Sequence, residues 1–98
     1  MPTEHKQVME SLALANKIRF ERAQIKRDLR SGKLTIAELV MEMPDSIKNC
    51  TVYEMLDAQD RWGRTRTLRL LLSLDIPEGK TFGWLSPRQL KLLEEEFS

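Results

Sequence analysis

Three segments of the sequence begin with the same helix-start signal, and this repeated signal limits the fold more than any other feature. In each segment a Ser or Thr hydroxyl can accept a hydrogen bond from a free backbone N–H, and a Glu or Gln three residues later can reach back to the first residue. Pro87 also stands at a first helical position, where its missing N–H costs nothing. The three pairs, each of which predicts a helix, are Thr35 with Glu38, Thr51 with Glu54, and Ser86 with Gln89.

Glycines and prolines separate the predicted helices from one another, as residues of turns do. They stand at Gly32, Pro44, Gly63, Pro77, Gly79 and Gly83. Between them the sequence predicts a long helix over about residues 4–30, then short helices near residues 35–43, 51–59, 64–74 and 86–97. No alternating run of β-branched residues indicates a strand. We therefore expect an all-α fold, in which a long basic helix within residues 1–33 precedes a small helical domain over residues 34–98.

Length and composition limit the class of protein. A chain of 98 residues, 41% hydrophobic and 32% charged, is large enough for one modest core, so we expect a single folding unit. No apolar run approaches the roughly 20 residues of a membrane span, and no secretory signal opens the sequence, so we expect a cytoplasmic protein. Cys50 and His5 are the only residues of their types. We therefore expect neither a disulfide nor a metal site, and no cofactor is implied.

Charge is segregated along the chain although the net charge is only +1. Residues 1–33 carry eight Lys and Arg against four acids, and residues 34–60 carry one against six. Residues 61–91 return to seven against two, and three glutamates follow in the last seven residues. Two basic blocks are thus separated by an acidic one. Such an arrangement can steer one face toward a polyanion while the whole molecule stays near neutral.

The most concentrated basic stretch, DRWGRTRTLRLLLSL at residues 60–74, leads into the most apolar predicted helix. Leucines cover most of this helix's circumference, which predicts that the other helices surround it. Arg64 and Arg66 lie in its first turn, where free N–H groups point outward and added positive charge is unfavourable. A phosphate would complete the site, since Gly63 leaves room near the backbone and guanidinium groups bind its oxygens bidentately. The alternative is that these arginines only solvate the helix end.

From about residue 14 to residue 97, the sequence resembles the actinobacterial integration host factors, which bind and bend DNA with little sequence preference. The step Gly63-Arg64-Thr65-Arg66 into the leucine-rich helix is similar to the family's Gly-Lys-x-Arg turn. Arg22 and the stretch LRSGKLTIAEL at residues 29–39 resemble the family's first helix, turn and second helix. The ending LLEEEF at residues 92–97 resembles its usual close.

The chain departs from this family at two positions, Arg61 and Asp75, where family members commonly have glycine. The first departure bears on the shape of the loop before Gly63. The resemblance implies a helix-two-turns-helix motif in a nucleoid-associated monomer that binds double-stranded DNA, from a bacterium or one of its phages. It makes a phage integrase complex acting on the same DNA a candidate partner, and it implies no membrane and no small-molecule substrate.

Further basic residues could extend the DNA-binding surface. Arg19, Arg22, Lys26 and Arg30 recur three or four residues apart and form one stripe on the predicted long helix. The first three of these residues are expected to face away from the core. This stripe is interpreted either as a solvated face or as a second surface that tracks phosphates. Lys80 and Arg88 are expected at the rim. The full predicted interface consists of the stripe, Lys80, Arg88, Arg61, Trp62, Gly63, Arg64, Thr65, Arg66 and Arg69.

Aromatic and apolar residues near these cations admit structural interpretations. Trp62 could insert against bent DNA as a wedge, or it could anchor its loop to the core. Phe82 and Trp84 are expected to pack in the core or in a loop. On the long helix, one apolar stripe is expected to pack against the leucine-rich core. It consists of Leu14, Ile18, Ile25 and Leu29.

Other function classes fit the sequence less well. Some DNA glycosylases carry a helix-two-turns-helix domain and use an N-terminal proline amine. Here Thr3 rather than glutamate follows Pro2, and the zinc cysteines and the length for a catalytic domain are lacking. The glutamates at residues 94–96 have no catalytic partner nearby in sequence, so we expect no enzyme. An RNA-binding protein with the same motif and a helical protein-interaction module stay open as alternatives.

Overall fold

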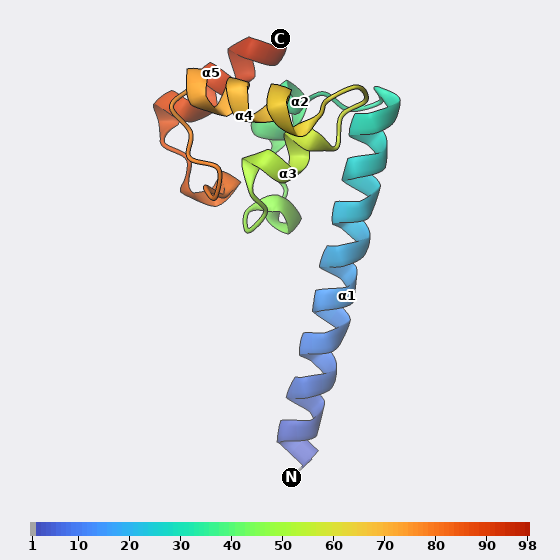
Figure 1. The fold of residues 1–98 in the computed structure, drawn as a ribbon. Helices are drawn as coiled ribbons and strands as arrows, with labels where there is room; N and C mark the ends of the chain where they lie inside the picture. Colours follow the sequence, from blue (N-terminus) through green and yellow to red (C-terminus); the bar gives the residue numbers. More distant parts are fainter. Residues whose placement is uncertain (1) are drawn as a thin grey trace.

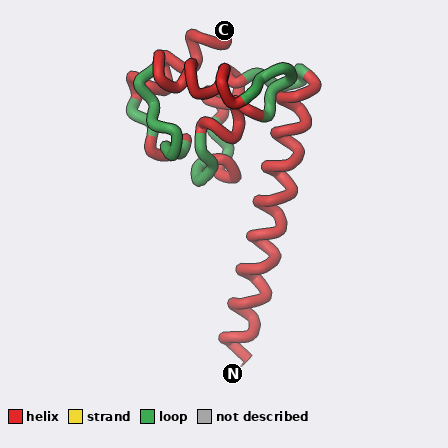
Figure 2. The backbone as a smooth tube through the Cα atoms, in the orientation of Figure 1, coloured by secondary structure: helices red, strands yellow, loops and turns green. Residues whose placement is uncertain are grey.

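The computed structural model describes residues 2–98 of the chain, and side-chain environments from residue 12 onward. Its elements follow the predicted order (Figure 1). The α-helices are α1 (Pro2–Ser31), α2 (Ile36–Glu42), α3 (Val52–Asp57), α4 (Arg64–Ser73) and α5 (Pro87–Phe97). Two short 3-10 helices, η1 (Asp45–Ile47) and η2 (Phe82–Trp84), lie between them. Figure 2 shows helices joined by loops, with no strand among the described residues, so the all-α prediction is confirmed.

The predicted helix-start signals act as caps. Thr35 and Thr51 each accept a hydrogen bond from the backbone N–H three residues later, at 3.1 and 3.2 Å. At α5 the full reciprocal box forms, since Ser86 Oγ accepts from Gln89 N at 3.2 Å and Gln89 Oε1 accepts from Ser86 N at 3.0 Å. These bonds satisfy N–H groups that have no partner within their helices, which explains why the boundaries were readable from sequence.

The sequence did not predict the two 3-10 helices or the pairing between the segments that carry them. Phe82 N donates to Cys50 O at 3.0 Å, and Gly83 N donates to Lys48 O at 2.9 Å. Thr51 and Thr81 form an isolated antiparallel bridge. These contacts join residues about 30 positions apart through backbone atoms alone, so no pattern of side chains in the sequence could predict them.

Helix α1 lies beside the small helical domain only near its C-terminal end and projects away from it at its N-terminal end (Figure 1). Leu29 is buried in the common core and Ile25 is half-buried against it. Leu14, which we expected in the same packed stripe, is 59% exposed, so that part of the prediction was wrong. The helix has 30 residues, about 45 Å at 1.5 Å per residue, and outruns the surface it could cover.

One apolar cluster holds the other helices together. Helix α5 packs against α2 and contributes Leu93, which is fully buried. Helix α3 contributes Met55 and Leu56, and η2 contributes Phe82, so the core prediction for this phenylalanine is confirmed. Since Leu29 belongs to the same cluster, the long helix and the domain share a core. The division of the chain at residue 33 stays a prediction.

The leucine-rich helix α4 is buried on one side only, contrary to the expectation that other helices surround it. Thr67, Leu71 and Leu74 recur at the spacing of one helix face and are all buried. Leu72 points the other way and is 84% exposed. The helix therefore lies at the surface, because the chain has too few elements to cover both of its sides.

Trp84 also differs from the prediction, since it is 79% exposed instead of packed. Its neighbour Phe82 takes the interior position within η2, and a turn of 3-10 helix cannot point both rings inward.

No helix in the part of the chain that the structure describes combines the length and the apolar character that a membrane crossing needs.

The one-sided burial of α4 predicts opposite outcomes for two adjacent leucines. Leu71→Ala should lower the free energy of unfolding by about 2–5 kcal/mol, because it opens a cavity in the core. Leu72→Ala should change it by no more than about 0.5 kcal/mol, because that side chain is already in water. Urea unfolding followed by circular dichroism measures both. Similar losses for the two variants would mean that α4 is covered on both sides.

Candidate nucleic-acid interface

The N-terminus of α4 is open and carries no side-chain cap. Gly63 is the N-cap residue, in extended conformation, and nothing lies within 4 Å of the position that a Cβ would occupy there. Unlike α2, α3 and α5, this helix therefore begins with N–H groups that no side chain of its N-cap residue satisfies. Arg64, Thr65 and Arg66 form its first turn and are all exposed. Free N–H groups and cations thus gather at one solvent-facing point.

A buried threonine fixes this open end. Thr67 N donates to Gly63 O at 3.0 Å, and the Thr67 hydroxyl donates to the same oxygen at 2.9 Å. Thr67 has no exposed surface. These two hydrogen bonds anchor Gly63 to the core side of α4. The loop backbone before the helix is therefore held in place, while its outer surface stays exposed to solvent.

The loop before Gly63 keeps a left-handed residue at the position where the resemblance led us to expect glycine. Arg61 has φ 64°, and Asp75, at the other such position, has φ 57°. Both values lie in the region that glycine adopts without strain and that other residues rarely occupy. The backbone conformation expected of glycine is therefore present at both positions, although the side chains differ.

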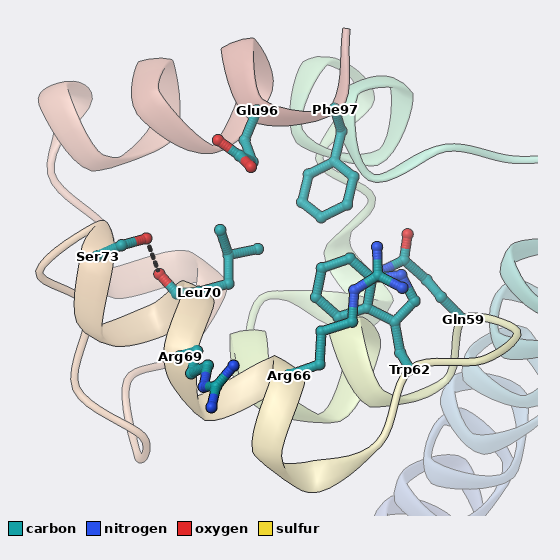
Figure 3. Close-up of a pocket in the computed structure, with 8 residues that line it drawn as sticks. All are labelled: Gln59, Trp62, Arg66, Arg69, Leu70, Ser73, Glu96 and Phe97. Carbon is teal, nitrogen blue, oxygen red and sulfur yellow. Dashed lines mark hydrogen bonds between the residues drawn. The ribbon is translucent and has the colours of Figure 1, made fainter.

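Trp62 lies in this loop, and two other side chains hold its ring (Figure 3). The centroid of the Trp62 ring is 5.6 Å from that of Phe97, at an interplanar angle of 42°. The Arg66 guanidinium carbon lies 4.1 Å from the Trp62 ring centroid, a cation–π contact. Trp62 is half-buried. Of the two interpretations of this residue, the geometry favours the loop anchor over the wedge.

An open hollow of about 600 Å³ lies between α4, the loop and the end of α5. Figure 3 shows Glu96 and Phe97 reaching into it from α5, while Leu70 and Arg66 rise from α4. Arg69 also lines the hollow, and its guanidinium lies apart from the aromatic pair in Figure 3. Arg66 and Arg69 therefore both contribute positive charge to the lining of this hollow.

Arg30 reaches the same region from the end of α1. It lines a second hollow of about 300 Å³ together with Arg61 and Trp62. Both arginines are exposed. The tertiary structure thus brings one member of the predicted stripe next to the predicted loop, across 31 positions of sequence.

Two other members of the stripe, Arg22 and Lys26, face the domain, so the expectation that they point away from the core was wrong. Arg22 Nε donates to Ser46 O at 2.6 Å. Lys26 forms an ion pair with Glu54 on α3, and both side chains are about two-fifths exposed. The cause is the position of η1 and α3, which lie against this side of α1 and offer a carbonyl and a carboxylate. Arg19 is exposed.

Lys80 and Arg88 lie together at the other end of α4. They line a hollow of about 260 Å³ with Asp75 and Ser86, next to the end of α4 and the start of α5. Helix α4 has 10 residues, about 15 Å at 1.5 Å per residue, and this length separates the pair from Gly63. They form a second basic position, not a part of the loop site.

The residues that sequence reasoning missed are Phe97, Ser46 and Glu54. Each is a partner of a predicted residue, but none carries a signal of that pairing, since the partners are 24 to 35 positions apart.

Cys50, the lone cysteine, is buried. Burial, with the nearby Glu54 carboxylate, raises the pKa of the Cys50 thiol. The thiolate that nucleophilic chemistry needs is therefore disfavoured.

Comparison with known proteins adds one solved structure that this chain resembles. No family model and no curated protein matches the sequence. An integration host factor, sIHF, solved with an 8-base-pair palindromic DNA, matches with a TM-score of 0.79 and 26% identity. The match covers 88% of this chain and 99% of the other. The class defined by fold and site is thus a small all-α protein with an exposed cationic helix start, similar in structure to an integration host factor.

The left-handed conformation of Arg61 predicts which substitutions the loop tolerates. Arg61→Gly should leave the free energy of unfolding unchanged or raise it by up to about 1 kcal/mol, because relief of left-handed strain exceeds the added freedom of the unfolded chain. Arg61→Val, which removes the same charge, should lower it, because a β-branched residue fits this conformation poorly. Denaturant unfolding compares them. Equal stability of the two variants would contradict the observed loop geometry.

Proposed function

We propose that this protein binds double-stranded DNA through its phosphate backbone, with little sequence preference, and bends it. The observation that carries the proposal is the uncapped N-terminus of α4, where Gly63 is open to solvent and Arg64 and Arg66 stand beside free N–H groups. The likeness to an integration host factor solved with DNA supports it. On this proposal the protein works on the bacterial or phage DNA of the nucleoid, in the cytoplasm.

Electrostatics explains why an anion would complete the helix start. The N-terminus of a helix carries a partial positive charge, and cations placed there repel it. No acidic residue lies in the first turn of α4 to offset this charge. A phosphate oxygen accepts hydrogen bonds from the free N–H groups and binds guanidinium groups bidentately, so it relieves the repulsion and satisfies the donors together.

The residue types at the site favour backbone contact over reading of bases. Arg64, Thr65 and Arg66 form the first turn, and no Asn or Gln stands among them to pair with base edges. Contacts to phosphates position a protein on the duplex but carry no sequence information. Affinity should then come from neutralised phosphates and should fall steeply with salt.

Bending of the DNA is proposed to result from its contact with two separated basic positions on the protein. Arg30 and Arg61 stand beside the loop site, while Lys80 and Arg88 lie about 15 Å away at the far end of α4. A duplex that contacts both positions must follow the surface between them, and the added phosphate contacts offset the cost of deforming it. Arg22 and Lys26 hold α1 against the domain in this scheme, and the exposed Arg19 is available to a phosphate farther along.

Removing the two first-turn arginines should weaken binding to unrelated duplexes by similar factors. In Arg64→Ala/Arg66→Ala, the slope of log K against log salt should fall by up to about 0.9 for each lost phosphate contact. Fluorescence anisotropy over several salt concentrations measures this slope. Loss of the Arg66 contact with Trp62 costs at most about 1 kcal/mol of stability, so the variant should stay folded.

The matched control for that experiment is Lys48→Ala/Lys91→Ala, which removes the same charge at exposed positions outside the proposed interface. Its salt slope should equal that of the wild type. Undiminished affinity of the arginine variant for random duplexes would overturn the proposed site.

Two further measurements test bending and the choice of nucleic acid. Fluorescent dyes on the two duplex ends report bending of the DNA in the same titration. If structured RNA displaces the labelled duplex at a lower concentration than unlabelled DNA does, the RNA-binding alternative is favoured.

Substitutions at Gly63 should separate stability from binding. Gly63→Asp and Gly63→Asn both supply the missing cap and should raise stability by a few tenths of a kcal/mol. Gly63→Asp also places a negative charge where the phosphate is proposed to bind, so like-charge repulsion should weaken DNA binding by about tenfold or more. Gly63→Asn, which lacks the charge, should weaken binding less. Thermal unfolding and anisotropy measure the two effects, and equal DNA affinity of the Asp and Asn variants would place the phosphate elsewhere.

A further inference from the structure

We propose that Phe97, at the end of α5, is a positioning residue for DNA binding, because it holds Trp62 and thereby the guanidinium of Arg66. The inference rests on the proposed function and adds a residue that carries no charge and lies 31 positions after Arg66 in sequence. It connects the C-terminal helix to the loop site through a continuous stack of three side chains from α4, the loop and α5 (Figure 3).

The first step of the argument is that Arg66 is not a freely moving side chain. Its guanidinium carbon lies 4.1 Å from the Trp62 ring centroid. An unrestrained arginine loses much side-chain entropy when it binds a phosphate, and a planar guanidinium fixed on a ring loses less. Restraint by Trp62 therefore prepares Arg66 for an anion at the start of the same helix.

The second step is that Trp62 depends on Phe97 for its own position. The ring is only half-buried, and the loop around it is held by backbone contacts such as Trp62 N to Gln59 O at 3.3 Å. Phe97 supplies the aromatic contact, 5.6 Å between centroids in a tilted arrangement that aromatic pairs favour. Without this ring, Trp62 can turn toward the open hollow of about 600 Å³, and Arg66 follows it.

The third step is that Phe97 is held by contacts far from the charged loop. Leu93, one helical turn earlier, is fully buried in the core. At the other end of α5, Gln89 closes the capping box with Ser86 and also donates to Asp75 O at 2.9 Å. The position of the Arg66 cation thus depends on the docking of α5, a helix that the proposed phosphate site does not include.

The experiment compares three variants with the wild-type protein in DNA anisotropy titrations over a range of salt. Phe97→Leu keeps an apolar side chain but removes the ring, and Phe97→Tyr keeps the ring. Thr35→Ala removes the side-chain cap of α2, outside the proposed interface, so it destabilises the domain without touching the stack. Each variant is made with Trp84→Phe, which leaves Trp62 as the only tryptophan and makes its fluorescence a direct readout of the stack.

A positioning role predicts that Phe97→Leu weakens binding, lowers the salt slope by up to about 0.9 and shifts the Trp62 emission. Phe97→Tyr should restore all three, and Thr35→Ala should leave the slope and the emission unchanged. If Phe97→Leu keeps the wild-type slope, or matches Thr35→Ala in every readout, Phe97 is only structural and the inference is overturned. A wild-type protein without affinity for duplex DNA would instead overturn the proposed function, and the inference with it.

Discussion

Helices α2 to α5 are each too short to be stable in water, and the rest of the structure depends on the single cluster that they bury together. They contain between 6 and 11 residues, whereas isolated helices shorter than about 12–15 residues are marginal. Their stability must therefore come from packing around residues such as Ile36, Met55 and Leu93. The long helix joins through Leu29, so the basic surfaces of α1 and α4 are held in one frame.

Charge in this molecule is divided between internal pairs and a free surface. Glu54 and Asp45, both from the acidic middle of the sequence, form ion pairs with Lys26 and Lys48. The hydrogen bond from Lys48 lowers the pKa of Asp45. These pairs serve orientation more than stability, since exposed ion pairs contribute little. The cations at the start of α4 are arranged differently. The Arg66 guanidinium lies over the Trp62 ring, and a contact of this kind leaves its positive charge in place.

The loop before α4 combines several features that cost stability in an isolated protein. Arg61 is left-handed, the helix start has no side-chain cap, and positive side chains face the positive end of the helix. Strain and unsatisfied donors of this kind gather at functional sites, where a ligand offsets them. Thr67 and the aromatic pair hold the loop in this arrangement, so the cost is borne by the core and the C-terminal helix.

The sequence by itself determined the α-helices and the location of the basic loop. Hydrogen bonds to Ser and Thr caps act within three residues, so the helix starts at Thr35, Thr51 and Ser86 depend only on residues close in sequence. The tertiary structure alone decided which faces are buried and which cations are free. Leu72 and Trp84 lie outside because the neighbouring helices leave them uncovered. Lys26 is engaged because α3 places Glu54 beside it. Such outcomes depend on contacts between residues far apart in sequence, and no local pattern encodes the distance at which two helices meet.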